Sequence, residues 1–292
     1  MKSVLMPVTH CLSVLCCALA VACGAPAATT APPPKPLKPL NYVAMGDSVA
    51  AEPDVPPPAP PPGCQKSANN YPSVLARRVN ATRFVDVTCS GATADDITNH
   101  HQQTSDGTEP PQIDAVQPDT TLITITIGGN DVGLAFDASQ CWSASIDSPP
   151  CKAKFVVNGN DTISTAIGTH LSSWATMIDD VRAKAPGARI VLVGYPTYIR
   201  AGGCFAVQPV LPGDADYFQA KVNELDDRQK QLAADKGISY FDTRALSVGH
   251  DMCAAPNQRY VEGFITANPA APLHPNAVGA AAIGNALADY LR

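Results

Sequence analysis

Three short motifs in this chain contain residues that could carry out acyl transfer. Ser48, in the sequence GDS, directly follows the apolar stretch 41–46, and its hydroxyl could act either as a nucleophile or as a helix cap. A nucleophilic hydroxyl needs a base that removes its proton and donors that hold the developing oxyanion. The backbone amides of Ser48 and Gly91 (in SGAT) and the side-chain amide of Asn130 (in GGND) could be those donors. Taken alone, each motif could equally be an ordinary turn or cap.

The base should be a histidine, because this side chain is the one best suited to exchange protons near neutral pH. His274, in PLHPNAVG, stands immediately before the Ala-rich stretch that ends the chain, and Pro275 stiffens the turn there. The other histidines lie in the N-terminal leader, in a polar loop, within a predicted helix or before a cysteine; they are His10, His100, His101, His170 and His250. His274 is therefore the candidate base.

Strand-like and helix-like stretches alternate after residue 40. The predicted strands are 41–46, 83–89, 120–129, 188–196 and 238–243, and the predicted helices are 72–80, 163–187, 214–237 and 276–292. This alternation predicts a parallel sheet with helices on both faces. The stretch 120–129 is rich in β-branched residues and apolar on both faces, which is typical of a central strand.

The predicted sheet gives the three motifs a common location. Ser48, Gly91 and Asn130 each follow the carboxyl end of a predicted strand, and ligands of such sheets bind beyond those ends. We therefore expect the three residues to converge on one crevice. The segments 52–63 and 132–162 are predicted loops at the same edge, and their shape should set which substrates fit.

The N-terminus predicts export. Lys2 precedes an apolar run, 11–22, that is too short to span a bilayer, so residues 1–22 are interpreted as a signal peptide. Two processing routes remain open. Cleavage after Ala22 is one; the other is a lipoprotein route with Cys23 as the lipidated residue, although Ala20 stands where a lipoprotein box usually has Leu.

Residues 23–40 are rich in Pro, Ala and Thr and are expected to form an extended tether, followed by a single folded domain over 41–292. The formal net charge of −6 provides no basic surface, so we expect no nucleic acid partner. The protein is expected to be a monomer, secreted by a bacterium or attached to its cell envelope, with a lipid anchor if Cys23 is modified.

Six cysteines remain once the N-terminal leader is set aside, and an even number in an exported chain implies disulfides. Order along the chain favours pairing between neighbours, namely Cys64–Cys89, Cys141–Cys151 and Cys204–Cys253. The chain contains no Cys-x-x-Cys or His-x-x-x-His spacing, so no metal site is expected.

Taken together, these motifs resemble the SGNH (GDSL) hydrolase family. GDS at Ser48, SGAT at Gly91, GGND at Asn130 and HPNAVG at His274 occur in the family's order, from about residue 42 to the C-terminus. The resemblance implies a flavodoxin-like, three-layer α/β/α sandwich around a central parallel sheet. It also implies an exported serine esterase or lipase that works through an acyl-enzyme without cofactor or metal. Val49 replaces the Leu of the GDSL motif.

The stretch CQKSANNYPSVLA (64–76) and the six cysteines further resemble the secreted actinobacterial lipases and esterases, which implies three sequential disulfides. Many family members carry Asp three residues before the histidine, where this chain has Ala271. In the actinobacterial branch a main-chain carbonyl can orient the histidine instead, and we expect one near Ala271. An acid from elsewhere, with Glu262 and Asp251 nearest in sequence, is the alternative.

The expected substrate is an acyl lipid, a phospholipid or an acetylated envelope glycan. Two other functions remain open: an acyltransferase that uses the same site, and a non-catalytic envelope lipoprotein that keeps the fold for binding.

Overall fold

The computed structural model describes residues 39–292. The expected signal peptide, Cys23 and the expected tether up to residue 38 lie outside the described residues. The described chain contains a five-stranded parallel sheet with the strand order β2-β1-β5-β8-β9. Its strands are β1 (Asn41–Gly46), β2 (Arg83–Asp86), β5 (Leu122–Thr126), β8 (Arg189–Val193) and β9 (Ser239–Phe241). The fully buried β5 is the middle strand, as its apolar pattern predicted.

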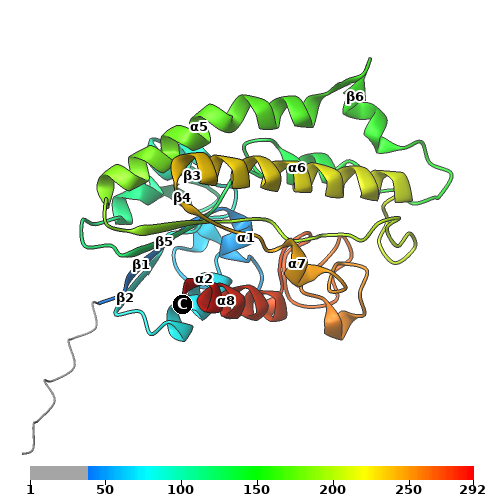
Figure 1. Cartoon of the computed structure of the whole chain (residues 1–292). Helices are drawn as coiled ribbons and strands as arrows, with labels where there is room; N and C mark the ends of the chain where they lie inside the picture. Colours follow the sequence, from blue (N-terminus) through cyan, green and yellow to red (C-terminus); the bar gives the residue numbers. More distant parts are fainter. Residues whose placement is uncertain (1–38) are drawn as a thin grey trace, which may run out of the picture. The chain divides into compact units, whose positions relative to one another are not determined.

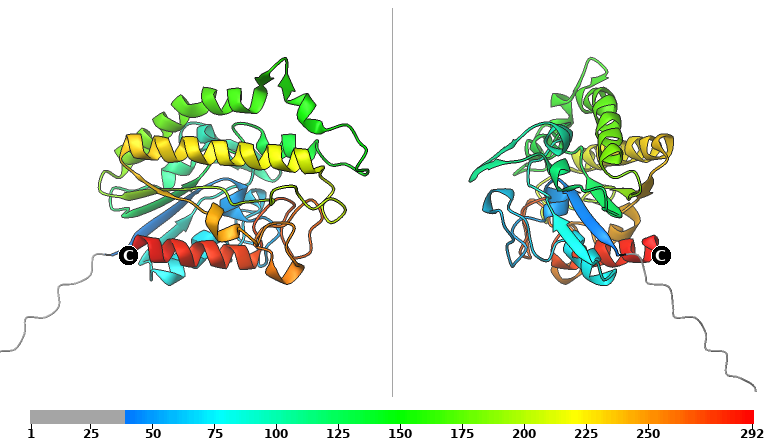
Figure 2. Two further views of the ribbon diagram at one scale, coloured as in Figure 1. Left: turned by 45° about the vertical axis from the view of Figure 1, so that its right-hand side comes forward. Right: turned by 90° about the vertical axis from the view of Figure 1, so that its left-hand side faces the viewer.

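Helices cover both faces of this sheet (Figure 1). The long helices α5 (Thr162–Lys184) and α6 (Pro212–Lys236) pack on one face, whereas α2 (Tyr71–Arg78) and α8 (Ala277–Leu291) pack on the other. The two further views in Figure 2 show the same three layers. The predicted three-layer α/β/α fold is therefore confirmed.

The alternation of side chains along β1 builds two separate cores. Val43 and Met45 pack in the core shared with α5 and α6, whereas Tyr42 and Ala44 pack in the core shared with α2 and α8. Successive side chains of a strand point to opposite faces, so a central strand must be apolar throughout to bury both. This requirement explains why β1 reads as an uninterrupted apolar stretch.

The predicted strands and helices all form, but several are shorter than expected. The stretch 83–89 forms a strand only over β2 and the stretch 120–129 only over β5, although the amides of Val87 and Cys89 still donate to carbonyls of β1. Gly128, with φ of +116°, adopts a backbone conformation that favours glycine as the chain turns away. The residues after each strand are thereby free to build the crevice at the carboxyl edge.

Local structure also forms where loops were expected. The predicted loop 132–162 contains helix α4 (Leu134–Ser139), the 3₁₀ turn η3 (Cys151–Lys154) and a hairpin of β6 (Val156–Val157) and β7 (Asn160–Asp161). The helix expected to start at Ser48 forms as α1 (Ser48–Ala51). The sequence did not predict α3 (Ala94–Thr98), α7 (Arg244–Ser247), the hairpin of β3 (Gln102–Thr104) and β4 (Gly107–Glu109), or the turns η1 (Pro62–Cys64), η2 (Gln112–Ala115) and η4 (Pro256–Gln258). Each is too short to produce a hydrophobic period.

Three disulfides tie the loops at the carboxyl edge of the sheet. They join Cys64 to Cys89, Cys141 to Cys151 and Cys204 to Cys253, with Cα atoms 4.2, 5.1 and 5.7 Å apart. These are the pairs of neighbours that the order of the cysteines favoured. Within residues 39–292, no helix combines the length and apolarity needed to cross a membrane.

Candidate active site

Ser48 lies at the first position of α1, directly after β1. The carboxylate of Asp47 caps this helix by accepting a hydrogen bond from the amide of Val49 at 2.9 Å. The serine hydroxyl is therefore not needed as a cap. It lies instead 2.7 Å from Nε2 of His274, a residue more than two hundred positions away in the chain.

His274 is presented by a turn just before α8. Leu273 adopts a left-handed conformation with φ of +64°, and Asn276 caps the helix through the amides of Val278 and Gly279. Nδ1 of His274 lies 2.7 Å from the carbonyl oxygen of Pro272. Because a carbonyl can only accept, Nδ1 carries the proton and the lone pair of Nε2 faces the serine. This is the arrangement that a general base needs.

The environment of His274 favours the neutral imidazole. Desolvation lowers the pKa of His274 below its usual value, and the hydrogen bond to Pro272 opposes this shift only in part. At neutral pH the imidazole is therefore mostly unprotonated and able to accept a proton.

The two acids that could have oriented this histidine are engaged elsewhere. Glu262 is fully buried and accepts hydrogen bonds from the side chains of Asn268 and Asn276, both at 2.7 Å. Asp251 is paired with the guanidinium of Arg200. Among residues 39–292, no carboxylate makes a hydrogen bond or ion pair with His274. Its Nδ1 partner is the carbonyl of Pro272, one residue beyond Ala271.

The three candidate oxyanion donors occupy the same edge of the sheet. Among the described residues, neither the amide of Ser48 nor that of Gly91 donates to an internal acceptor. Gly91 has a φ of +85°, a conformation that favours glycine, and the nearby Cys89 is held against the end of β1 by donating to the carbonyl of Gly46. The side chain of Asn130 donates one hydrogen bond to the carbonyl of Ala92 at 2.9 Å, which leaves its second N–H free.

A buried tyrosine links two of the segments that carry these donors. The hydroxyl of Tyr195, which follows β8, donates to Asp47 at 2.5 Å and accepts from the amide of Gly129 at 2.7 Å. Burial raises the pKa of Asp47 to about 7, against the opposing effect of this hydrogen bond. Sequence reasoning missed Asp47 and Tyr195, although Tyr195 follows a buried strand at the edge where ligands bind.

An apolar cavity opens beside the serine and histidine. Ser48, Asn130 and His274 line one end of it, whereas Gly91 is not part of its lining. Its walls come from α4, α6 and the loops before α6 and α8, and include Leu134, Ile199, Val210, Phe218, Met252 and Phe264. The region 132–162 thus shapes the cavity, as expected. The other predicted loop, 52–63, contributes nothing to the lining and instead supports the histidine turn, because the carbonyl of Pro53 accepts from the amide of Ala271.

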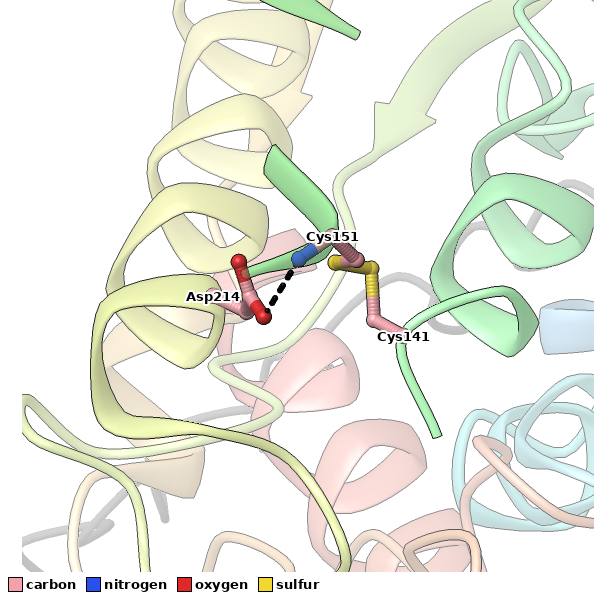
Figure 3. A group of neighbouring side chains, drawn as sticks. All are labelled: Cys141, Cys151 and Asp214. Atoms are coloured by element: carbon pink, nitrogen blue, oxygen red, sulfur yellow. Dashed lines mark hydrogen bonds between the residues drawn. A yellow bond between two sulfur atoms is a disulfide. The ribbon is translucent and has the colours of Figure 1, made fainter. Parts of the chain in front are cut away.

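One cluster near this cavity has the residue types of a metal site. Ligand atoms of Cys141, Cys151 and Asp214 lie within 4.8 Å of one another. Figure 3 shows that the two sulfur atoms are bonded to each other and that Asp214 accepts a hydrogen bond from the amide of Cys151. A second amide, that of Lys152, donates to the same carboxylate at 2.9 Å. Since zinc binds thiolates rather than disulfides, we interpret the cluster as a capped and cross-linked turn.

Comparisons with known proteins show which family the chain belongs to. Residues 44–282 match the model of the GDSL-like Lipase/Acylhydrolase family. The chain is 36% identical over 249 residues to Lipase 2 of Streptomyces coelicolor, covering 82% of each chain. Among solved structures it is similar to phospholipase A1 from Streptomyces albidoflavus NA297, with a TM-score of 0.73, 25% identity and coverage of 86% of this chain and 99% of that one. An extracellular lipase from Streptomyces rimosus has the same TM-score at 24% identity, covering 87% of this chain and 100% of its own, and shares the fold.

Proposed function

Because the chain belongs to the GDSL-like lipase/acylhydrolase family and is a carboxylic ester hydrolase, we propose that Ser48 is its nucleophile and His274 its general base. The observation that carries this assignment is the 2.7 Å contact between Oγ of Ser48 and Nε2 of His274, with Nδ1 engaged by a carbonyl. Of all the described hydroxyls, this serine is the one that hydrogen bonds to a histidine ring.

Hydrolysis then proceeds through an acyl-enzyme. Nε2 of His274 takes the proton of Ser48 as Oγ attacks the acyl carbon, and the carbonyl oxygen becomes an oxyanion. The amides of Ser48 and Gly91 and the free N–H of Asn130 donate to that oxyanion. The imidazolium next gives its proton to the departing alcohol. Water, deprotonated by the same imidazole, attacks the acyl-serine and releases the acid and the free hydroxyl.

The partner of Nδ1 sets how strongly the imidazolium is held. The Pro272 carbonyl fixes the tautomer and the ring orientation, but it brings no negative charge to the imidazolium that forms during the reaction. We therefore interpret the site as a Ser-His dyad rather than a triad with a side-chain acid.

The cavity favours a substrate with a hydrocarbon chain. Its walls are mostly apolar, although Tyr195, Tyr198 and Gln219 also line it, and each buried methylene contributes about 0.8 kcal/mol of transfer free energy. An acetyl group would leave most of these walls without a partner. We therefore propose that acyl lipids, including phospholipids, are preferred over acetylated glycans.

We also propose that the enzyme acts outside the cytoplasm, secreted or attached to the cell envelope. The three disulfides support this location, because disulfides persist in oxidising compartments and are rare in reducing ones. A signal peptide over 1–22 and a lipid anchor at Cys23 remain predictions from the sequence.

The assignment is tested with p-nitrophenyl esters of increasing acyl length. Ser48→Ala should lower kcat by several orders of magnitude and abolish covalent labelling by a phosphonate, with no change in the melting temperature. His274→Ala should lower kcat to a similar extent. Turnover by purified Ser48→Ala that approaches the wild-type rate would contradict the proposal.

The chain offers a matched control for the histidine. Nδ1 of His250 also lies within hydrogen-bond distance of a carbonyl, that of Gln258 at 2.6 Å, but its ring stacks on Tyr260 and contacts no serine. His250→Ala should therefore retain kcat. Repeating the wild-type assay with added glycerol separates hydrolysis from acyl transfer, because a transferase would form the glyceryl ester in preference to the free acid.

A further inference from the structure

Several large apolar side chains lie exposed around the cavity instead of packing in a core. Each exposes more than half of its surface to solvent; they are Phe136, Trp142, Ile146, Val207 and Ile265, here called the rim. Exposed apolar residues that occur singly are ordinary, whereas contiguous ones mark an interaction surface. The rim residues come from three parts of the chain, so their relative positions depend on the contacts between those parts.

Hydrogen bonds join the three segments that carry the rim. The amide of Ser143 donates to the carbonyl of Pro209 at 2.7 Å, which links the Trp142 loop to the Val207 loop. The side chain of Gln208 then pairs with both the N–H and the C=O of Ile265, each at 3.0 Å. The disulfides Cys141–Cys151 and Cys204–Cys253 further hold these loops. The loops that carry Trp142, Val207 and Ile265 are thus held next to one another.

The rim borders the mouth of the cavity that leads to Ser48. Ala138 and Cys141, Val210 and Phe264 line that cavity, and each is a close chain neighbour of a rim residue. In Figure 1 the loops before α6 and α8 gather at the right-hand end, whereas the C-terminus lies at the opposite end. We therefore expect a lipid chain to enter the cavity on the side of the rim.

The charged residues near the rim indicate which kind of lipid surface it would bind. The segments 138–146, 201–213 and 263–273 contain no Asp, Glu, Lys or Arg. The charged residues beside them are of both signs: Asp137 follows Phe136, Asp147 follows Ile146, and Lys154 donates to the carbonyl of Gln140. Attraction to anionic lipids requires a cluster of basic residues, and these segments have none. An exposed tryptophan beside aliphatic side chains is typical of residues at the boundary between lipid and water.

We propose that the rim docks on a neutral or zwitterionic lipid surface, so that ester lipids enter the cavity directly from the lipid phase. This inference rests on the proposed function, because it takes the cavity as the acyl site of Ser48. Docking is driven by burial of the rim in the lipid boundary and not by charge.

Trp142 is a built-in probe of this docking. The chain has two tryptophans, and the other one, Trp174, is buried. In a Ser48→Ala background, which leaves the lipid intact, phosphatidylcholine vesicles should shift the Trp142 emission to shorter wavelength, and lipids with brominated acyl chains should quench it. Trp174→Phe isolates the signal; if that variant does not fold, vesicle flotation of the Ser48→Ala protein replaces it.

Replacing the rim residues should weaken the binding of the enzyme to lipid surfaces. Replacing Phe136, Val207 and Ile265 together by Ser should weaken vesicle binding at least tenfold. It should also lower hydrolysis of vesicle lipid relative to hydrolysis of a water-soluble short ester by a similar factor. Tyr290→Ser is the matched control, because Tyr290 is exposed near the C-terminus, away from the rim, and should leave both quantities unchanged.

The outcomes separate this inference from the proposed function. Vesicle binding that strengthens with anionic lipid and weakens with salt would overturn the inference, as would hydrolysis of soluble esters without vesicle binding. Sedimentation experiments could also show a dimer that binds no vesicles and that the rim variant does not form. The rim would then be an interface between two copies of the chain, and the inference would be overturned. Vesicle binding by a wild-type protein that hydrolyses no ester would instead overturn the proposed function.

Discussion

Two neighbouring residues, Asp47 and Ser48, separately cap a helix and contact a histidine. Asp47 caps α1, and Ser48 faces His274 with its hydroxyl unused by the backbone. The same carboxylate accepts a hydrogen bond from the hydroxyl of Tyr195. That hydroxyl in turn accepts a hydrogen bond from the amide of Gly129, the residue before Asn130. Tyr195 is therefore positioned to fix the distance between Ser48 and Asn130, the proposed nucleophile and oxyanion donor.

Tyr195→Phe should lower kcat about tenfold while changing KM little. The change leaves a buried carboxyl and a buried amide without their partner, which costs about 1–3 kcal/mol and releases the Asn130 segment. Steady-state kinetics with a short soluble ester measures the effect.

Tyr71→Phe is the control for that experiment. Its hydroxyl is also buried and bonded, to the side chain of Thr126 at 2.8 Å, but it holds neither Asp47 nor Gly129. It should lower stability without lowering kcat. Equal kcat losses in the two variants would show that Tyr195 has a structural role only.

Glu262→Gln should reduce kcat far less than the loss of a triad acid, which costs about ten-thousandfold. The side chain of Glu262 holds Asn276, the cap of α8, and only the backbone amide of Glu262 bonds to His274, through its carbonyl, so changing the side chain should mainly lower the melting temperature. Asp251→Asn should behave similarly, because Asp251 pairs with Arg200. A fall in kcat of a thousandfold or more in either variant would show that its carboxylate assists His274, and would contradict the interpretation as a Ser-His dyad.

At the scale of elements, the region 132–162 forms one wall of the cavity through α4 and Cys141, and η3 supports that wall from behind the disulfide. The disulfide Cys141–Cys151 joins these two elements, and Asp214 at the start of α6 caps η3 through the amides of Cys151 and Lys152. Cys141 itself lines the cavity. The position of α4 relative to α6, and with it the width of the cavity, depends on this cross-link.

Replacing Cys141 and Cys151 together by Ser should lower the free energy of unfolding by about 2–4 kcal/mol, the usual contribution of such a cross-link. It should raise KM for long-chain esters more than for an acetyl ester, because only a long acyl chain needs the wall at Cys141. Urea unfolding and kinetics across acyl lengths check the two effects. Equal changes in KM at every chain length would show that the cavity does not select substrates by acyl length.

At the scale of the whole molecule, two buried carboxyls lie beneath the carboxyl edge of the sheet. Burial raises the pKa of Asp47 and that of Asp226 to about 7 in each case. An unfolded chain ionises its aspartates near pH ~3.9, so between that pH and about 7 the unfolded state releases protons that the folded state keeps. These two groups therefore stabilise the fold fully in acid, and their contribution is lost as the pH rises to about 7.

Asp47→Asn should reduce this dependence on pH. Each such group can change the free energy of unfolding by at most about 1.4 kcal/mol per pH unit, so the variant should lose less stability than the wild type between pH ~5 and ~7. Urea unfolding at several pH values measures the slope, with the exposed Asp289→Asn as the control. An unchanged slope in Asp47→Asn would show that Asp47 is ionised throughout this range.

The sheet, the long helices and the residue types of the site could be predicted from the amino-acid sequence. Strands β1 and β5 are buried on both faces and so carry continuous apolar residues, and α5 and α6 are long enough to show a helical period. Ser48 and His274 were identifiable because four short motifs, each weak by itself, occur in the order of one family. The order of the cysteines favoured the disulfide pairs, and the family resemblance implied them.

The surroundings of Ser48 and His274, in contrast, depend on how distant parts of the chain pack together. Every residue has a carbonyl, so nothing in the sequence marks that of Pro272 as the partner of His274. Tyr195 reaches Asp47 across 148 positions of the chain, a contact that no local pattern encodes. The acyl cavity and the rim likewise arise where short elements and loops from separate parts of the chain meet, because only packing brings side chains that are distant in sequence onto one surface.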